Sequence, residues 1–290
     1  MFQKNLKNTI IRRLSLVLTI LISLTGLPAL AQDFPSYLSN EASKRSAMEG
    51  KWSVQLDEQA VPVLSFLLEE FIRWVGPGIM LNEDCVVCNI PQLNSPCFIG
   101  CIVPARIVLT QESHSYWSQT IYQLSHEMCH YAFSQCKENK NCTLSWFEEI
   151  VCEAVSLCAL EYAAHNWSNC QLAKLNPIYH TSIESYLNDR LAEEGTDGLK
   201  QCDSVAKLAE YETHKVAENQ RETHRNEMHA VYRAISANPG ELKCVLNYTK
   251  YLENNGVIID FDRWIQDTPC NLLNILNQIQ PVKQGNNNAN

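Results

Sequence analysis

The spacing of apolar residues along the chain predicts a mainly helical protein. Apolar side chains recur every three or four positions, the period of a helix, in most of the chain beyond residue 58. The predicted helices are Gln59–Trp74, Tyr116–Tyr131, Leu144–His165, Ile178–Glu194, Gln201–Ser236 and Leu242–Asn254. Arg106–Thr110, which is β-branched, is the best strand candidate, and the cysteine-rich segment from Cys85 to Cys101 is expected to be a loop. The expected fold class is α+β, predominantly α-helical, with a small strand-bearing N-terminal part.

The first 31 residues have the pattern of a secretory signal peptide. Four basic residues precede an uncharged apolar run from Leu14 to Leu27, and Ala29-Leu30-Ala31 has the small-x-small form of a cleavage site. The run is shorter than the roughly 20 residues that a spanning helix needs. We therefore expect an exported protein, periplasmic or extracellular, without a membrane span after cleavage.

The remaining chain is expected to contain one main domain. Residues 32–58 are polar and predict an N-terminal arm, residues 59–284 form the domain, and the Gly/Asn-rich residues 285–290 predict a disordered tail. Within the domain, residues 59–143 are expected to form an α+β part that includes the helix Tyr116–Tyr131, and residues 144–284 are expected to be helical.

Charge and cysteine content narrow the class of protein. Lys and Arg number 23 against 32 Asp and Glu, a net charge of -9, and removal of the four basic residues of the signal leaves 19 against 32, or -13. So acidic a chain is not expected to bind nucleic acid, which requires clustered basic residues. Thirteen cysteines behind a signal peptide predict disulfides rather than a thiolate metal site.

One motif carries candidate chemistry. His126-Glu127-Met128-Cys129-His130 has the form HExxH and lies within a predicted helix. Histidines at i and i+4 share one helix face, so both imidazoles can reach one Zn²⁺, with Glu127 beside it as a general base. A catalytic zinc takes a third protein ligand. The next helix offers Glu148, Glu149 and Glu153; we favour Glu149 and leave the other two open.

At these residues the chain resembles the gluzincin superfamily of zinc metallopeptidases, over about Arg106 to Glu153. In that family a glutamate ligand follows HExxH after roughly 18 to 20 residues, and 18 residues separate His130 from Glu149. The resemblance implies one zinc ion held by His126, His130 and Glu149, and implies that Glu153 orients His126 from outside the ligand set. It also implies a zincin-like active-site helix and places Arg106–Thr110 as the edge strand that pairs with an extended substrate.

The resemblance implies hydrolysis of peptide bonds in a peptide or protein substrate, by water activated on zinc with Glu127 as the base. A further donor should stabilise the developing oxyanion. Among Tyr162, His165, Tyr179 and His180 we favour Tyr179 and His180, because they follow Pro177 in a predicted helix-start region. The alternative function is a non-catalytic, zinc-bearing exported protein, used for binding or structure and stabilised by disulfides.

The cysteine pairing is left open by the sequence. Cys136 and Cys142 flank a hydrophilic loop and can pair with each other. Cys129 and Cys152 lie in the two helices that would carry the zinc ligands, so they can either join those helices or leave Cys129 as the unpaired thiol that an odd number requires.

Overall fold

The computed structural model describes residues 44–46, 51–55, 60–113, 115–138, 142–216 and 220–282, the backbone alone at 44–46 and 215–216. The chain divides into two compact units, Met1–Lys44 and Arg45–Asn290. The predicted signal peptide and the predicted tail lie outside the described residues. Among the helices that are described, none is long and apolar enough to cross a membrane.

The second unit contains a small mixed sheet with strands in the order β2-β3-β5-β4. The strands are β2 Trp52–Gln55, β3 Cys85–Asn89, β4 Cys97–Ile99 and β5 Ala105–Leu109, and a further strand, β1 Lys44–Ser46, spans the boundary between the units. β2, β3 and β5 are parallel, whereas β4 runs antiparallel to β5, with Phe98 opposite Ile107. Parallel neighbours require a crossover connection, which helix α2 supplies between β2 and β3.

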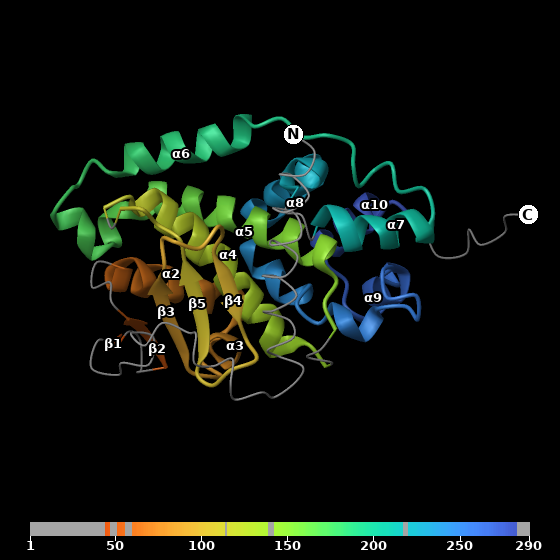
Figure 1. Ribbon diagram of the computed structural model, residues 1–290, viewed down its shortest axis with the longest axis horizontal. Coiled ribbons are helices and arrows are strands. Elements are labelled where there is room, and N and C mark those ends of the chain that lie inside the picture. The colour runs from red at the N-terminus through yellow and green to blue at the C-terminus, as the bar shows by residue number, and fades with distance from the viewer. Residues whose placement is uncertain are drawn as a thin grey trace, which may run out of the picture. The chain divides into compact units, whose positions relative to one another are not determined.

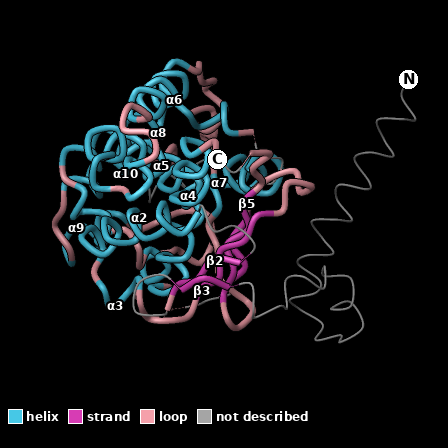
Figure 2. The backbone as a smooth tube through the Cα atoms, turned by 90° about the vertical axis from the view of Figure 1, so that its left-hand side faces the viewer, coloured by secondary structure: helices cyan, strands magenta, loops and turns pink. Residues whose placement is uncertain are grey.

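Helices make up most of the rest of this unit and gather on one side of the sheet (Figure 2). The α-helices are α2 Ala60–Val75, α3 Pro77–Met80, α4 Trp117–Cys136, α5 Ser145–Asn166, α6 His180–Ala192, α7 Val205–Tyr211, α8 Arg225–Ala237, α9 Phe261–Asp267 and α10 Asn271–Ile279. Short 3-10 helices cover Trp167–Asn169, Gln171–Lys174, Arg221–His224, Pro239–Cys244 and Tyr248–Tyr251, and a π-helix covers Glu212–Val216.

Helix α5 is the centre of the core. Its residues are buried along almost the whole length, including Trp146, Val151 and Leu160. It packs between α4 on one side and α6 and α8 on others (Figure 1). The apolar composition of this segment predicts an interior helix, and contacts with α4, α6 and α8 on several sides account for that composition.

The α+β fold class and the helices α2, α4, α5 and α6 are confirmed, whereas several expectations are wrong. The segment Cys85–Cys101 contains strands β3 and β4 rather than only a loop. β3 is buried on both faces, so it shows no alternation of apolar and polar residues that would reveal a strand. The predicted arm 32–58 contains strand β2, which pairs with β3.

Two predicted helices in the C-terminal part are also corrected. Gln201–Ser236 is broken into α7, a π-helix, a 3-10 helix and α8, and Leu242–Asn254 contains two 3-10 helices. In the latter segment Tyr248 turns its hydroxyl inward to the backbone of Leu144, a tertiary contact that a local helix period does not anticipate. Helices α9 and α10, seven and nine residues long, are too short to have been recognised by period.

Candidate metal centre

The candidate ligands lie on α4 and α5, which pack antiparallel to each other. Glu148, near the start of α5, contacts His130 near the end of α4, while Glu153, further along α5, lies beside His126 earlier on α4. Both helices turn apolar faces into the core. Packing on these faces brings the HExxH motif and the acidic cluster together.

The start of α5 is stabilised by a residue far away in the sequence. Leu144 occupies the N-cap position and provides no side-chain acceptor. Instead the carboxylate of Glu212 accepts hydrogen bonds from the backbone N–H groups of Ser145 at 2.6 Å and Trp146 at 2.9 Å. A negative charge is favourable at a helix N-terminus, so this contact helps to hold the first turn of α5, which carries Glu148 and Glu149.

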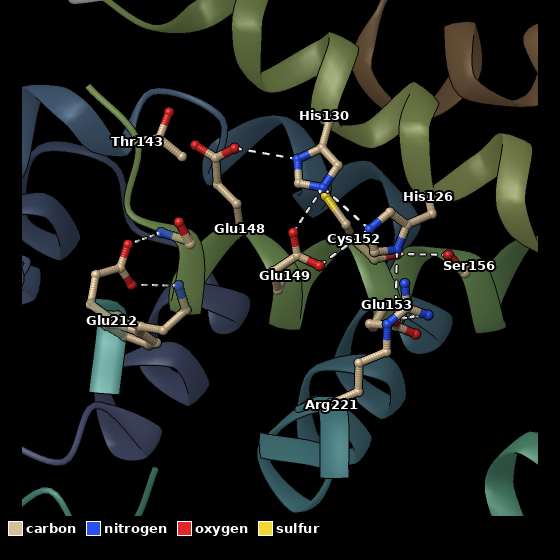
Figure 3. Close-up of polar contacts among 12 residues, drawn as sticks. His126, His130, Thr143, Glu148, Glu149, Cys152, Glu153, Ser156, Glu212 and Arg221 are labelled. Atoms are coloured by element: carbon tan, nitrogen blue, oxygen red, sulfur yellow. Dashed lines mark hydrogen bonds and ion pairs between the residues drawn. The ribbon is translucent and has the colours of Figure 1, made fainter. Parts of the chain in front are cut away.

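His126, His130 and Glu149 converge on one point (Figure 3). His126 Nε2 lies 3.3 Å from Glu149 Oε2, His130 Nε2 lies 3.3 Å from Glu149 Oε1, and the two Nε2 atoms are 3.2 Å apart. A tetrahedral ion with bonds of about 2.0–2.1 Å separates its ligand atoms by about 3.3 Å. The spacing of these three groups therefore fits a single metal ion of zinc type.

The cluster is buried at one end and accessible at the other. The side chain of His126 is 4% exposed, whereas those of His130 and Glu149 are 17% and 26% exposed. Burial alone would raise the pKa of Glu149, but hydrogen bonds with His126 and His130 hold it well below its ordinary value of 4.5. Glu149 is therefore ionised, as a metal ligand must be.

Each histidine turns its other ring nitrogen toward a second carboxylate. His130 Nδ1 lies 3.3 Å from Glu148 Oε2, and His126 Nδ1 lies 3.9 Å from Glu153 Oε1. Such outer carboxylates fix the tautomer and direction of a metal-binding imidazole. Of the two residues that the sequence left open as third ligands, Glu148 takes this outer role. Glu153 lies beside His126, but at 3.9 Å it makes no hydrogen bond with the ring. Figure 3 shows the two contacts on opposite sides of Glu149.

Both outer carboxylates are held by a cation and a tyrosine. Glu153 lies 2.6 Å from Arg221 Nη1 and accepts a hydrogen bond from Tyr122. Burial would raise its pKa, but the charges of Arg221 and His126 and the hydrogen bond from Tyr122 together outweigh that effect and lower it.

Glu148 has a corresponding pair of partners. Its Oε1 atom lies 2.5 Å from Lys137 Nζ and accepts a hydrogen bond from Tyr248. Burial would raise its pKa, while the contacts with His130 and Lys137 lower it on balance. Both outer carboxylates are therefore ionised, and Glu148 can accept a hydrogen bond from His130 Nδ1.

Glu127 is in a different environment from the other three carboxylates. It is 3% exposed, and burial raises its pKa above 4.5 even though His126 and His130 act in the opposite direction. Strand β4 lies close to it, since burial and the charge of Glu127 together raise the pKa of the Cys97 thiol to about 12. A carboxyl group with a raised pKa suits a general base that must also release its proton.

The structure does not bring the two expected oxyanion donors to this cluster. The hydroxyl of Tyr179 accepts a hydrogen bond at 3.2 Å from the backbone of Ser118, two turns before His126, and its ring packs on Trp117. His180 is at the surface, with Nδ1 3.2 Å from the Pro177 carbonyl. Neither contacts His126, His130 or Glu149 within the described part of the chain. The favoured assignment of Tyr179 and His180 therefore has no support in the geometry.

The edge strand is also corrected. β5, which corresponds to the predicted strand Arg106–Thr110, lies between β3 and β4 and is paired on both sides. β4, Cys97–Ile99, is the outer strand next to α4. The cysteine-rich composition of the segment Cys85–Cys101 favoured a loop there.

Four residues around the cluster were missed by sequence reasoning. Tyr122 lies four residues before His126, and Lys137 follows His130 by seven, so helix spacing was a usable signal for both. Arg221 and Tyr248 come from segments far along the chain, and no local pattern marks them. His224 is buried at 2% exposure, with Nδ1 3.0 Å from the hydroxyl of Tyr211.

Comparison with protein-family models, with curated proteins and with solved structures found no match for this chain. The function must therefore be inferred from the chemistry of the cluster itself.

Proposed function

We propose that this chain is an exported zinc-dependent metallopeptidase that hydrolyses peptide bonds. The observation that carries the proposal is the convergence of His126, His130 and Glu149 at ligand spacing, with Glu127 buried next to both histidines. Three protein ligands with an accessible side are typical of a catalytic zinc site, because a structural site takes four.

The charges around the cluster support a divalent cation. Four carboxylates, Glu127, Glu148, Glu149 and Glu153, face two basic side chains, those of Lys137 and Arg221. With both histidines neutral, as metal ligands are, and all four carboxylates ionised, two negative charges remain in a buried region, and buried charge is costly unless it is compensated. A divalent ion would supply the two missing positive charges.

The residues of the chain would divide the work as follows. When bound, zinc lowers the pKa of a water molecule and polarises a carbonyl group. Glu127 accepts the proton of the attacking water and passes it to the leaving amine, a transfer that its raised pKa favours. Glu148 would hold the ring of His130 in the direction of the ion, and Glu153 places a negative charge 3.9 Å from Nδ1 of His126.

Strand β4 is the candidate support for an extended substrate. Within the described residues its far edge has no strand partner, and it lies close to Glu127. A peptide that adds to such an edge is held by backbone hydrogen bonds, which do not depend on its sequence.

Metal analysis combined with cleavage profiling tests the proposal. Purified wild type should contain one zinc per chain and cleave members of a peptide library. Glu127→Gln should keep the zinc and lose cleavage by at least 100-fold, since general-base catalysis contributes about 10²–10⁴. Glu184→Gln, at an exposed position of α6, is the matched control and should behave as wild type.

The ligand assignment is tested separately. His126→Ala, His130→Ala and Glu149→Gln should lose stoichiometric zinc, whereas His165→Ala, an exposed histidine on α5, should keep it. Zinc retained without any cleavage would instead support a non-catalytic zinc-bearing protein. Absence of zinc from wild type, or cleavage unaffected by Glu127→Gln, would refute the peptidase.

A further inference from the structure

A pair of buried cysteines lies between the two helices of the metal centre. Cys129 on α4 and Cys152 on α5 are both 0% exposed. Besides burial, an interaction with Cys129 raises the pKa of the Cys152 thiol, so the two side chains lie near each other across the helix interface. Figure 3 shows Cys152 on the same helix as Glu149 and Glu153. Two thiols in contact across a helix interface, unlike a lone cysteine, already meet the first requirement for a covalent bond.

The flanking contacts hold the two thiols in this position. Glu148 contacts His130 on one side of the pair, and Glu153 lies beside His126 on the other. The helices therefore cannot slide or separate at this point without breaking the ligand cluster. A disulfide needs the two backbones to be close and the two side chains to point toward each other, and antiparallel helices packed on small thiol side chains provide both.

Cys244 and Cys270 also interact with each other, but both are partly exposed and neither lies on α4 or α5. Cys88 on β3 and Cys97 on β4 are both opposite Val108 of β5, so a whole strand separates them. Two strand spacings are about 9.6 Å, beyond the separation of about 7 Å that a disulfide can bridge. Cys88 and Cys97 therefore cannot form a disulfide in this fold. Cys129 and Cys152, on two helices in direct contact, are better placed to form one.

We propose that Cys129 and Cys152 form a disulfide that covalently joins α4 to α5. The thirteen cysteines all lie within described residues, and none is joined to another in this structure. The oxidant is an external disulfide, such as oxidised glutathione or a thiol–disulfide oxidoreductase. One thiolate attacks it and releases one thiol, and the second thiolate attacks the mixed disulfide and releases another. Two protein thiols thus lose two protons and two electrons, and one disulfide becomes two thiols.

The position of this bond gives it a consequence for the metal centre. Cys129 directly precedes His130, and Cys152 directly precedes Glu153. A bond between them fixes the register of α4 against α5, and it removes two thiols that would otherwise compete with the histidines for zinc. The inference concerns the oxidised chain and holds whether or not the protein is a peptidase.

Peptide mapping under non-reducing conditions tests the bond. The full chain is folded with a mixture of reduced and oxidised glutathione, denatured, alkylated without reduction and digested with trypsin. Cys129 shares a tryptic peptide with Cys136, and Cys152 shares one with Cys142, Cys158 and Cys170. A Cys136–Cys142 bond, or a bond from Cys129 to Cys158 or Cys170, would therefore link the same two peptides. The map is therefore repeated in Cys136→Ala/Cys142→Ala, with fragmentation to assign the linked residues.

The link between the two peptides should persist in Cys136→Ala/Cys142→Ala and be lost when Cys129→Ala is added. Alkylation of both Cys129 and Cys152 in the oxidatively folded chain would overturn the proposal. If the added substitution prevents folding, the alkylation state of wild type still decides.

Thermal unfolding gives a second, independent readout. A reducing agent should lower the Tm of wild type and of the control Cys158→Ala, a buried cysteine of α5 whose thiol contacts the Tyr232 carbonyl. In wild type and in Cys158→Ala, the decrease in Tm caused by the reducing agent should be at least twice the decrease measured for Cys129→Ala/Cys152→Ala. An equal shift in all three proteins would count against the bond.

Discussion

Removal of the Lys137 charge should expose how much the buried carboxylates depend on their cations. Lys137 Nζ lies 2.5 Å from Glu148, and the two side chains are 7% and 4% exposed. Lys137→Met keeps the length and apolar stem of the side chain but leaves Glu148 as a buried carboxylate without its cation. Tyr248 and His130 still contact that carboxylate, so it is not left without any partner.

The size of the effect follows from the burial of the pair. Removing one partner of a buried ion pair costs about 3–5 kcal/mol. The two remaining hydrogen-bond partners place the expected loss near the lower limit, about 3 kcal/mol. In a domain of this size 1 kcal/mol corresponds to a Tm change of about 2–4 °C, so Lys137→Met should lower the Tm by about 6–12 °C.

Thermal unfolding of the metal-free protein at pH 7, followed by far-UV circular dichroism, measures this loss. Lys207→Met is the matched control, because Lys207 also contacts a carboxylate, Asp203 at 2.8 Å, but at the surface. It should leave the Tm unchanged within error. Lys137→Met/Glu148→Gln should recover part of the loss, since the unpaired charge is then gone. A Tm for Lys137→Met equal to that of the Lys207→Met control would refute the reasoning.

Three other predictions concern the same region. Burial lowers the pKa of His130, but its contacts with Glu148 and Glu149 raise that pKa well above 6.5 in the metal-free protein. The protonated ring therefore stabilises the folded state fully below pH 6.5, and this stabilisation is lost as the pH rises through the pKa of the folded state. Metal binding must displace that proton, so titration calorimetry in two buffers of different ionisation enthalpy should detect proton release; identical heats would contradict this. Glu153→Gln should weaken zinc affinity about 10–100-fold in competition with a chelating dye, and an unchanged affinity would show that it does not orient His126. Glu212→Ala should lower the Tm by about 2–4 °C through loss of about 1 kcal/mol at the start of α5, and a Tm equal to that of wild type would rule out the cap.

Much of the helical framework could be predicted because helix period is a local property. The predictions for Gln59–Trp74 and Leu144–His165 agree with α2 and α5 to within one residue at each end. The strands were recognised less well, because β3 and β4 are short and their side chains are not sorted into one polar and one apolar face.

The ligand set was predictable for the same local reason. Helix geometry alone puts His126 and His130 on one face. The choice of Glu149 over its neighbours rested on its spacing from His130, and Glu149 is the glutamate that approaches both histidines in the structure. The choice of Tyr179 and His180 rested on position after a proline, and such a position says nothing about which way the segment packs.

By itself, the sequence determined the helices α2, α4, α5 and α6 and placed His126 and His130 on one face with Glu149 as the favoured third ligand, because these features depend on residues within a few turns of each other or on a short connection. Only the tertiary structure decided what surrounds them. Arg221 and Tyr248 reach Glu153 and Glu148 from segments 68 and 100 residues away, and β4 rather than β5 takes the edge. Such contacts arise from the packing of distant segments around a buried helix, which no local period encodes.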